Sequence, residues 1–515
     1  MKKVLSLVLA LLMALVALPV LAESDETVTL SMFSQKGALQ GAWEDMPFFQ
    51  EMEKITGVNF TFDLVDSSAL AERKALLLGS GTLPDVMAGI SFTEGELLQY
   101  GSMGAFLPLE DYINDETMPN LTAFLEAHPE YRAMMTSADG HIYSLMYISA
   151  APRDEAYYKI WVNNDWLQAL NLEVPTTLDE FYNMLVAFKN EDPNQNGQAD
   201  EVPISFATEG VNIDMFRAAI LSAYGIAGTN AGNSDMYIDG DGNVQYIYSS
   251  DEYKAYLEFA NKLYSEGLLD NECFSQTSAQ LTAKGNQSLV GCFMSLASYL
   301  VDKTENFPIY ESIPPMISET NSEQIEWRNW LGYMGTFVLS STCSNPEAAL
   351  RWADYLFTYD GAALLSQGPE GLGWEYTDET HTYWAKKVPE GYASSEEYRG
   401  TLTPDCGTFM VGYIPPEFLG FLSAPHVVNL EEHVAKSYTP YLKDGYPRVK
   451  LSSEAQEIVT TYYSDIDKYV KSSEARFISG DLSIDQWDEY IANLTSMHLA
   501  DYLQVYVDAY ADYNA

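Results

Sequence analysis

The sequence predicts an α/β protein built as two lobes. The N-terminal part alternates between short strand patterns and helix patterns, a rhythm typical of a parallel sheet with helices on its faces. The chain has 515 residues, which is more than one hydrophobic core usually supports. Together these two observations favour two lobes, each with its own sheet.

The first elements can be placed from their patterns. Residues 28–32 alternate between apolar and polar side chains and predict a strand. A helix follows from about Asp45, with Pro47 in its first turn and Gly57 as its stop. Residues 58–65 form the next predicted strand. A helix over 70–78 and a short strand over 85–87 complete this strand–helix series.

The middle and the end of the chain are more helical. Thr177-Leu178-Asp179-Glu180 is a capping box that starts a helix running to about Lys189. The glycine-rich stretch 239–243 predicts a hairpin turn. Asn345-Pro346-Glu347 predicts another helix start, since Asn caps and Pro fits the first turn. From about Ser452 the tail is mostly helical.

The net charge excludes two classes of partner. The formal charge is −47 at pH 7, whereas phosphate binding needs basic patches, so we expect no nucleic-acid partner. The same charge opposes docking on anionic membranes. The plainer interpretation of this acidity is solubility, with a preference for cationic ligands as the alternative. We expect a monomer.

The N-terminus predicts a signal peptide over residues 1–22. Lys2 and Lys3 precede an apolar run over 4–20, and Val20-Leu21-Ala22 offers a cleavage site before Glu23. No later segment has about 18 uncharged apolar residues in a row, as a transmembrane helix would need. We therefore expect an exported protein that acts in the periplasm or outside the cell.

The cysteines leave the redox state open. None of them forms a CxxC motif, so a zinc ribbon or a thioredoxin-like centre is not expected. Four cysteines allow three pairings, and free buried thiols are an equal alternative. None lies near the predicted cleavage site, so a lipid-anchoring cysteine is not expected. The four are Cys273, Cys292, Cys343 and Cys406.

An acidic loop over residues 192–201 has the spacing of a calcium site. Oxygen-bearing side chains alternate, a glycine (Gly197) takes the sixth position, and two carboxylates end the run. The twelfth position is Pro203, where an EF-hand places a bidentate Glu, so a structural Ca²⁺ is expected rather than a switch. The alternative is a solvated turn. A dockerin is disfavoured because dockerins carry two such loops. The side-chain ligands predicted are Asp192, Asn194, Asn196, Asp200 and Glu201.

Several short motifs follow one another along the chain in a specific order, although each is weak alone. They are 79–86 (GSGTLPDV), 104–112 (GAFLPLEDY), 139–143 (DGHIY), 165–167 (DWL) with 174–177 (VPTT) leading into the acidic loop, 263–270 (LYSEGLLD), 345–349 (NPEAA) and Glu370-Gly371. In these motifs and their order, the chain resembles the extracellular solute-binding proteins of ABC importers, in the sugar-binding branch. It is similar above all to the larger oligosaccharide-binding members, such as the alginate-oligosaccharide-binding proteins.

The resemblance implies a periplasmic-binding-protein fold with a ligand cleft between lobes that close about a hinge. The implied lobes are approximately 23–145 with 300–375, and 146–299 with 376–515, the second carrying the calcium loop. It implies a carbohydrate ligand, delivery to a membrane permease, and a calcium shell to which Gln198 adds its backbone carbonyl. Asn163-Asn164 stands where such proteins often have a basic residue, and the anchoring cysteine of Gram-positive members is missing.

Aromatic side chains near loop signals are candidates for the sugar site. Sugar sites place aromatic faces against the apolar face of the ring, with a few polar groups for orientation. Core packing is the alternative for each tryptophan, and for Trp352, inside a predicted helix, it is the preferred one. Arg328 and Glu370 are candidate hydrogen-bonding partners of the ligand hydroxyls. The candidate rings are Trp43, Trp161, Trp330 and Trp374.

Catalytic motifs are lacking in the sequence. It contains no HExxH, no G-x-S-x-G and no Walker motif. The leading hypothesis is therefore a binding protein and not an enzyme. Peptide uptake is a variant within the same class. A secreted glycan-degrading enzyme with a calcium loop is the rival from another class, since the many Asp and Glu residues do not exclude a glycosidase pair.

Overall fold

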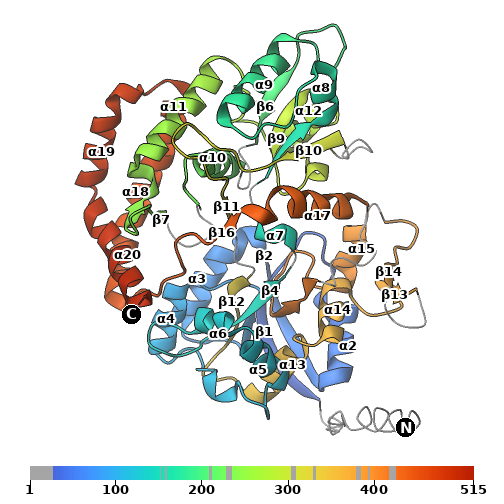
Figure 1. Ribbon diagram of the computed structural model, residues 1–515. Coiled ribbons are helices and arrows are strands. Elements are labelled where there is room, and N and C mark those ends of the chain that lie inside the picture. The colour runs from blue at the N-terminus through green and yellow to red at the C-terminus, as the bar shows by residue number, and fades with distance from the viewer. Residues whose placement is uncertain are drawn as a thin grey trace, which may run out of the picture.

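The structure, a computed structural model, describes residues 27–150, 152–156, 159–207, 212–227, 235–302, 309–328, 332–377, 384–392, 395–416 and 425–514. The predicted signal peptide over 1–22 lies outside the described residues. The described chain forms two lobes, each built around its own sheet (Figure 1). No helix within these ranges is both long and apolar enough to cross a membrane.

The first lobe contains a six-stranded sheet in the order β15-β4-β12-β3-β1-β2. Strand β12 runs antiparallel to its neighbours and the other pairs are parallel. The predicted strand–helix series over 28–87 is confirmed. The strands are β1 (Val28–Lys36), β2 (Val58–Asp66), β3 (Val86–Ala88), β4 (Leu145–Ser149), β12 (Gly332–Leu339) and β15 (Gly412–Ile414).

Helices cover this sheet and form its core with it. Helix α2 starts at Pro47 and stops at Gly57, whose φ of 71° suits a residue without a Cβ. Its buried face, Phe48, Phe49 and Met52, packs in the core of the lobe. The helices here are α2 (Pro47–Thr56), α3 (Leu70–Ser80), α4 (Glu94–Ser102), α5 (Pro119–Ala127), α6 (Pro129–Met135), α13 (Pro346–Tyr355), α14 (Tyr359–Gln367) and α15 (Ser395–Leu402), with a hairpin of β13 (Trp374–Tyr376) and β14 (Trp384–Lys386).

The second lobe contains a four-stranded sheet in the order β10-β5-β9-β6. The predicted capping box at Thr177 is confirmed, and so is the hairpin turn over 239–243. The strands are β5 (Ile160–Asn163), β6 (Val202–Ser205), β9 (Val290–Met294) and β10 (Tyr310–Ile313), and the hairpin is β7 (Met236–Ile238) with β8 (Val244–Tyr246). Its helices are α8 (Asn164–Leu170), α9 (Leu178–Asn190), α10 (Asn212–Ala223), α11 (Asp251–Ser265), α12 (Ser278–Gly285) and α17 (Pro425–Ser437).

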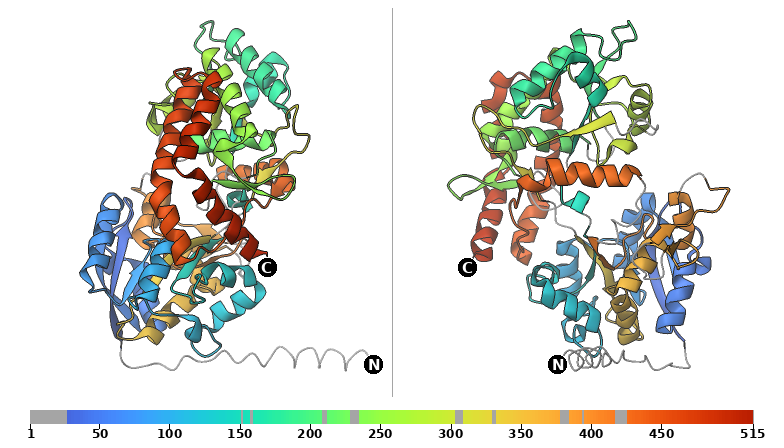
Figure 2. Two further views of the ribbon diagram at one scale, coloured as in Figure 1. Left: turned by 90° about the vertical axis from the view of Figure 1, so that its left-hand side faces the viewer. Right: turned by 45° about the vertical axis from the view of Figure 1, so that its right-hand side comes forward.

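The C-terminal helices lie along the second lobe and reach the first (Figure 2). They are α18 (Ser453–Ser479), α19 (Trp487–Ser496) and α20 (Leu499–Tyr513). Near its start, Gln456 of α18 packs against Gly95 of α4 in the first lobe. Farther along, Glu474 of α18 forms a buried ion pair with Arg217 of α10, at 2.6 Å between Nη2 and Oε2. The pair fixes α18 to the second lobe.

The chain passes between the lobes three times: between β4 and β5 through the short helix α7 (Pro152–Glu155), between β11 (Glu326–Trp327) and β12, and between β15 and α17. This division differs from the expected boundaries in two places. Strand β10, expected in the first lobe, joins the four-stranded sheet, and β15, expected in the second, joins the six-stranded sheet. Strand pairing decides the division, and the sequence pattern does not report which strands pair.

Candidate ligand-binding site and calcium loop

One edge of the six-stranded sheet faces the segments that connect the lobes. Strand β4 ends at Ser149, and β12 enters the sheet at Gly332, opposite Ile148, so both crossing segments meet this edge. It is also the edge at which the parallel strands β1, β2 and β3 end. In open α/β sheets, ligands bind outside the carboxyl ends of the strands. This edge is therefore the candidate ligand site.

Two exposed aromatic rings stack on each other at this edge. Tyr333 is 48% exposed and Phe409 is 36% exposed, and their ring centroids lie 4.8 Å apart with an interplanar angle of 23°. Tyr147 of β4 is buried beside them, with its ring centroid 5.0 Å from that of Phe409. Large exposed aromatic surface is unusual and marks sites of interaction. We call Tyr333 and Phe409 the aromatic pair.

The loop that carries Phe409 is fixed to the sheet edge by one amide side chain. The Gln40 Nε2 group donates to the backbone carbonyls of Pro404 and Cys406, at 2.5 and 3.1 Å, and to the Thr408 hydroxyl, at 3.1 Å. Trp43 in turn donates from Nε1 to Gln40 Oε1, at 3.0 Å. These bonds are buried, so they hold the loop in one position.

A buried charged cluster lies behind the aromatic pair. Asp405, 7% exposed, accepts a hydrogen bond from Arg399 Nη1 at 3.0 Å. Arg399 also donates from Nε and Nη2 to Glu396, at 2.9 and 2.8 Å. Burial raises the pKa of the Asp405 carboxyl, while the neighbouring Arg399 charge opposes this shift. The hydroxyl of Tyr147 lies beside Asp405, and burial together with that carboxylate raises its pKa well above the ordinary tyrosine value.

The crossing segments are joined by ion pairs. Arg328, a predicted ligand partner, pairs with Glu155 at 2.9 Å and with Asp444 at 3.2 Å. Arg153 of α7 pairs with Glu431 of α17 at 2.8 Å. These pairs connect segments that are distant in the sequence at the junction of the lobes. The role of Arg328 toward a ligand stays a prediction.

The structure does not bring the other described ligand candidates, Trp43, Trp161, Trp374 and Glu370, to the aromatic pair. Trp43 and Trp161 are 0% exposed and Trp374 is 6% exposed, so they offer no free ring face in this conformation. Their indole N–H groups donate to Gln40, to the Ser295 carbonyl and to the Gly368 carbonyl, respectively. Glu370 is exposed beside Trp374, and Trp330 lies outside the described residues. Their binding roles stay predictions.

Sequence reasoning missed the aromatic pair. Tyr333 is the second residue of β12, whose sequence does not alternate between apolar and polar side chains. Phe409 stands in a segment with no strong helix or strand pattern. The sequence does contain one signal for exposure of these rings, because each follows a glycine or a polar residue, in Gly332-Tyr333 and in Gly407-Thr408-Phe409. The positions of Tyr333 and Phe409 in the sequence do not indicate that the two rings lie side by side in the fold.

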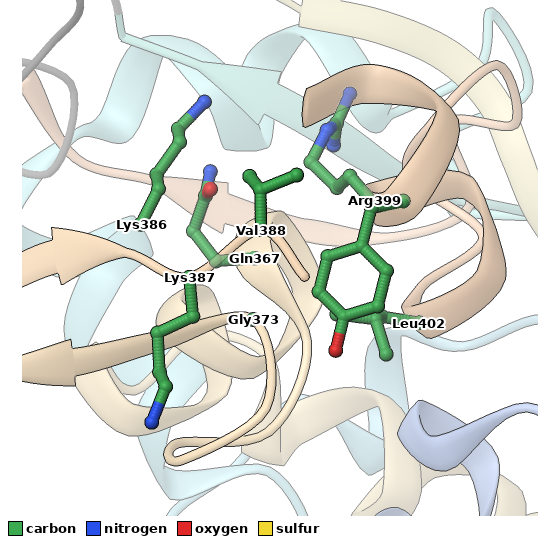
Figure 3. Close-up of a pocket in the computed structure, with 8 residues that line it drawn as sticks. Gln367, Gly373, Lys386, Lys387, Val388, Arg399 and Leu402 are labelled. Carbon is green, nitrogen blue, oxygen red and sulfur yellow. The ribbon is translucent and has the colours of Figure 1, made fainter. Parts of the chain in front are cut away.

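The pocket between the β13–β14 hairpin and α15 is too small for a sugar. Its volume is about 10 Å³, which is close to the least that holds one water molecule. Figure 3 shows the Lys386 and Arg399 side chains pointing to one side of it and Lys387 to the other. A wider groove of about 500 Å³ lies on the second lobe, between Thr176, Ile317, Gln324 and Tyr441. Neither contains the aromatic pair.

The acidic loop forms between α9 and β6, in the part of the second lobe far from the first (Figure 1). The Asp192 carboxylate accepts from the backbone N–H groups of Asn196 and Gly197, at 3.1 and 3.0 Å. The side-chain amides of Asn194 and Asn196 donate to Asp200, at 3.2 and 3.0 Å. The positive φ of Gly197, 75°, makes the sharp turn that the spacing predicts.

The loop gathers oxygen atoms and leaves one of them unsatisfied. The Glu201 Oε1 atom is buried and has no hydrogen-bond partner among the described residues. Such a buried carboxylate oxygen is costly unless it binds a donor or a cation. Neither this loop nor any other part of the described ranges contains three His, Cys, Asp or Glu side chains that cluster as a metal site. The donor set, with its asparagine oxygens and the orphaned Glu201 oxygen, fits a hard cation.

Comparisons with known proteins agree with this architecture. The chain is 29% identical over 483 residues to the fructooligosaccharide ABC transporter substrate-binding protein FusA of Streptococcus pneumoniae serotype 4, covering 90% of this chain and 87% of the relative. A solved structure of S. pneumoniae FusA, an EF-hand mutant in complex with fructo-nystose, matches with a TM-score of 0.78 at 26% identity, covering 94% of this chain and 99% of that chain.

A more distant structure, the alginate-binding protein AlgQ2 without calcium ion, has a TM-score of 0.71 at 22% identity and covers 95% of this chain and 99% of that chain. This match concerns the fold alone, and it confirms the two-lobed α/β fold. The family pattern of bacterial extracellular solute-binding proteins matches residues 34–363. The resemblance inferred from the sequence motifs is thereby confirmed: the chain belongs to the bacterial extracellular solute-binding protein family.

Proposed function

We propose that the protein is the substrate-binding component of an ABC importer, and that it captures an oligosaccharide between its lobes and delivers it to a membrane permease. The aromatic pair, Tyr333 with Phe409, carries this proposal. It presents ring faces at the sheet edge beside the crossing segments. Flat apolar rings with nearby polar groups suit the alternating apolar and hydroxyl faces of a sugar. The fructooligosaccharide-binding relative supports the same ligand class.

Binding needs no bond to be made or broken. The lobes are connected by segments that can act as a hinge, so a ligand contacting both lobes would favour the closed arrangement. The protein would act outside the cytoplasm, after removal of the predicted signal peptide, as a monomer. Only the closed form holds the two lobes in one fixed orientation relative to each other, so a permease would recognise that form.

A titration tests the proposed function. The purified protein, residues 23–515, should bind at least one member of a panel containing kestose, nystose, alginate trisaccharide, trigalacturonate, milk-type oligosaccharides and short peptides, measured by calorimetry. We expect saturable binding of a sugar with no increase in reducing ends over hours. Saturable binding of peptides alone, or release of reducing ends, would contradict the proposal.

The acidic loop would hold a structural Ca²⁺. Asp192, Asn194, Asn196, Asp200 and Glu201 would supply side-chain oxygens, and Gln198 its carbonyl. The orphaned Glu201 oxygen supports this assignment, and so does the existence of an EF-hand mutant of the similar protein FusA. The ion would connect the end of α9 to the start of β6. It would stabilise the second lobe and leave the aromatic pair, on the first lobe, unchanged.

Calcium removal should lower the melting temperature. An ion present at about a hundredfold above its Kd stabilises the folded state by about 2.7 kcal/mol, so we expect excess chelator to lower the melting temperature by a few degrees. Asp192→Ala should abolish this response. Asp241→Ala serves as the control, because it changes an aspartate in the exposed hairpin turn of the same lobe. A full calcium response in Asp192→Ala would reject the site.

A further inference from the structure

Helix α18 of the C-terminal part touches the first lobe outside the three crossing segments. Gly95, the second residue of α4, lies against the side chain of Gln456 in the first turn of α18: a Cβ atom at Gly95 would lie 3.0 Å from Gln456 Cδ. The Cα atoms of the two helices come within 8 Å of each other. Figure 2 shows α18 running from the second lobe to the first. We call this contact between Gly95 and Gln456 the brace.

We infer that the brace sets the orientation of the two lobes at one side of their junction, and that the protein keeps it both without ligand and with a ligand bound. Such a role goes beyond sugar capture, because it concerns the lobes whether or not a sugar is present. Three properties of the contact support it. Each half is attached to its own lobe, opposite charges lie beside it, and its fit depends on the missing side chain of Gly95.

The first half of the brace is fixed to the six-stranded sheet. Just before α4, the Phe92 N–H donates to the Gly335 carbonyl of β12 at 2.9 Å. A capping box starts α4: the Thr93 hydroxyl accepts from the Glu96 N–H at 3.2 Å, and the Glu96 carboxylate accepts from the Thr93 N–H at 2.8 Å. Lys74 of α3 pairs with that carboxylate at 2.8 Å. The start of α4 therefore moves with the first lobe.

The second half is fixed to the second lobe. Tyr446, which precedes α18, is buried, and its hydroxyl donates to the Tyr506 carbonyl of α20 at 2.6 Å. Between Tyr446 and α18, Val449 and Leu451 pack against the core of the second lobe. Farther along α18, the buried ion pair of Glu474 holds the helix to α10. The start of α18 therefore moves with the second lobe, and a displacement at the brace is a change in the orientation of the lobes.

Charges of opposite sign meet beside the brace. Glu94, the first residue of α4, keeps solvent-exposed surface. The protein around it still removes enough water to raise the pKa of its carboxyl to about 7, and the nearby Arg448 and Lys450 cations of the second lobe oppose this shift. Opposite charges attract more strongly where water is partly excluded. The three charges therefore favour contact between the lobes at this place.

The fit at the brace depends on glycine. A leucine at position 95 would extend into space that the Gln456 side chain occupies, while the helical backbone there accepts it. Gly95→Leu should therefore act as a wedge between the lobes. Gly79→Leu is the matched control, because Gly79 is a helical glycine of α3 in the same lobe, and no described atom outside its own helix lies within 4 Å of its Cβ position.

Small-angle X-ray scattering measures the effect of the wedge on the ligand-free protein. We expect a larger radius of gyration for Gly95→Leu than for the wild type and for Gly79→Leu. Gln456→Trp enlarges the same contact from the second lobe, so it should act alike, and it replaces Gly95→Leu if that variant does not fold. Radii equal to that of the control in both wedge variants would show that the brace does not set the orientation of the lobes.

Calorimetry with the tightest sugar of the panel measures the effect on binding. If the bound form keeps the brace, fewer molecules of a wedge variant are competent to bind, and we expect about tenfold weaker affinity, with Gly79→Leu unchanged. Unchanged or tighter binding in both wedge variants would contradict a brace in the bound form. If the wild type binds no sugar, the proposed function fails, whereas the scattering result still decides the role of the brace.

A covalent lock tests directly whether the brace persists on binding. The double variant Gly95→Cys with Gln456→Cys places two thiols across the contact, where a Cβ at position 95 lies 3.2 Å from the present Gln456 Cγ, so a disulfide can form. We expect the oxidised variant to form this disulfide and to bind the sugar as tightly as its reduced form. Failure of the disulfide to form, or a loss of binding on oxidation that reduction restores, would overturn the brace.

Discussion

Replacing Tyr333 or Phe409 by alanine is expected to weaken oligosaccharide binding by about 30-fold, or about 2 kcal/mol, which is the size of a hot-spot truncation. The two rings support each other at 4.8 Å, so loss of either one exposes the second and removes part of the flat surface. Because the rings interact, the double variant should lose less than the sum of the two single losses. Calorimetric titration with the tightest sugar of the panel measures each loss.

The control for this prediction is an exposed tyrosine elsewhere on the first lobe. Tyr359, at the start of α14, is 42% exposed, and Tyr359→Ala should leave the affinity unchanged. Thermal unfolding of all variants should stay within a few degrees of the wild type, since exposed side chains contribute little to stability. Unchanged affinity in Tyr333→Ala and in Phe409→Ala would remove the basis for placing the sugar at this edge.

Replacing Glu474 by alanine is expected to cost about 3–5 kcal/mol of unfolding free energy, because it leaves a buried guanidinium with Asp214, at 2.7 Å, as its remaining carboxylate partner. Arg217 is 2% exposed, and it donates to both carboxylate oxygens of Glu474, at 2.8 and 2.6 Å. Tyr256 donates a further hydrogen bond to the same carboxylate, at 2.8 Å. Removing this carboxylate therefore breaks the connection between α10 and α18. Denaturant unfolding followed by circular dichroism measures the loss.

A surface pair on the same helix provides the matched control. Lys471 pairs with Asp467 of α18 at 3.0 Å, but 64% of its side chain is exposed. Lys471→Ala should therefore change the unfolding free energy by less than about 1 kcal/mol. Equal losses in Glu474→Ala and Lys471→Ala would show that burial of the Arg217 pair does not stabilise the C-terminal helices.

Local signals in the sequence predicted local structure well. The capping box at Thr177, the proline at the start of α2, the Asn345 cap of α13 and the hairpin turn over 239–243 are all present. Each depends on hydrogen bonds or backbone angles within a few residues, which spacing encodes directly. The two-lobed α/β class was predictable for the same reason, since strand–helix alternation is a local pattern.

Contacts between distant segments were not predictable in this way. The lobe boundaries depend on which sheet β10 and β15 join, and the aromatic pair depends on the approach of residues 333 and 409. The predicted tryptophans were selected because loop signals surrounded them, yet Trp43 and Trp161 are fully buried and donate hydrogen bonds inside the lobes. Burial of a large ring depends on its three-dimensional neighbours, so the loop signal alone does not indicate whether a ring is exposed.

A crystal structure of the protein with its tightest-binding oligosaccharide tests the central claim most directly. We predict a sugar ring lying against Tyr333 and Phe409, between two closed lobes. A sugar bound elsewhere, for example in the groove beside Tyr441 of the second lobe, with the aromatic pair still exposed to solvent, would contradict it.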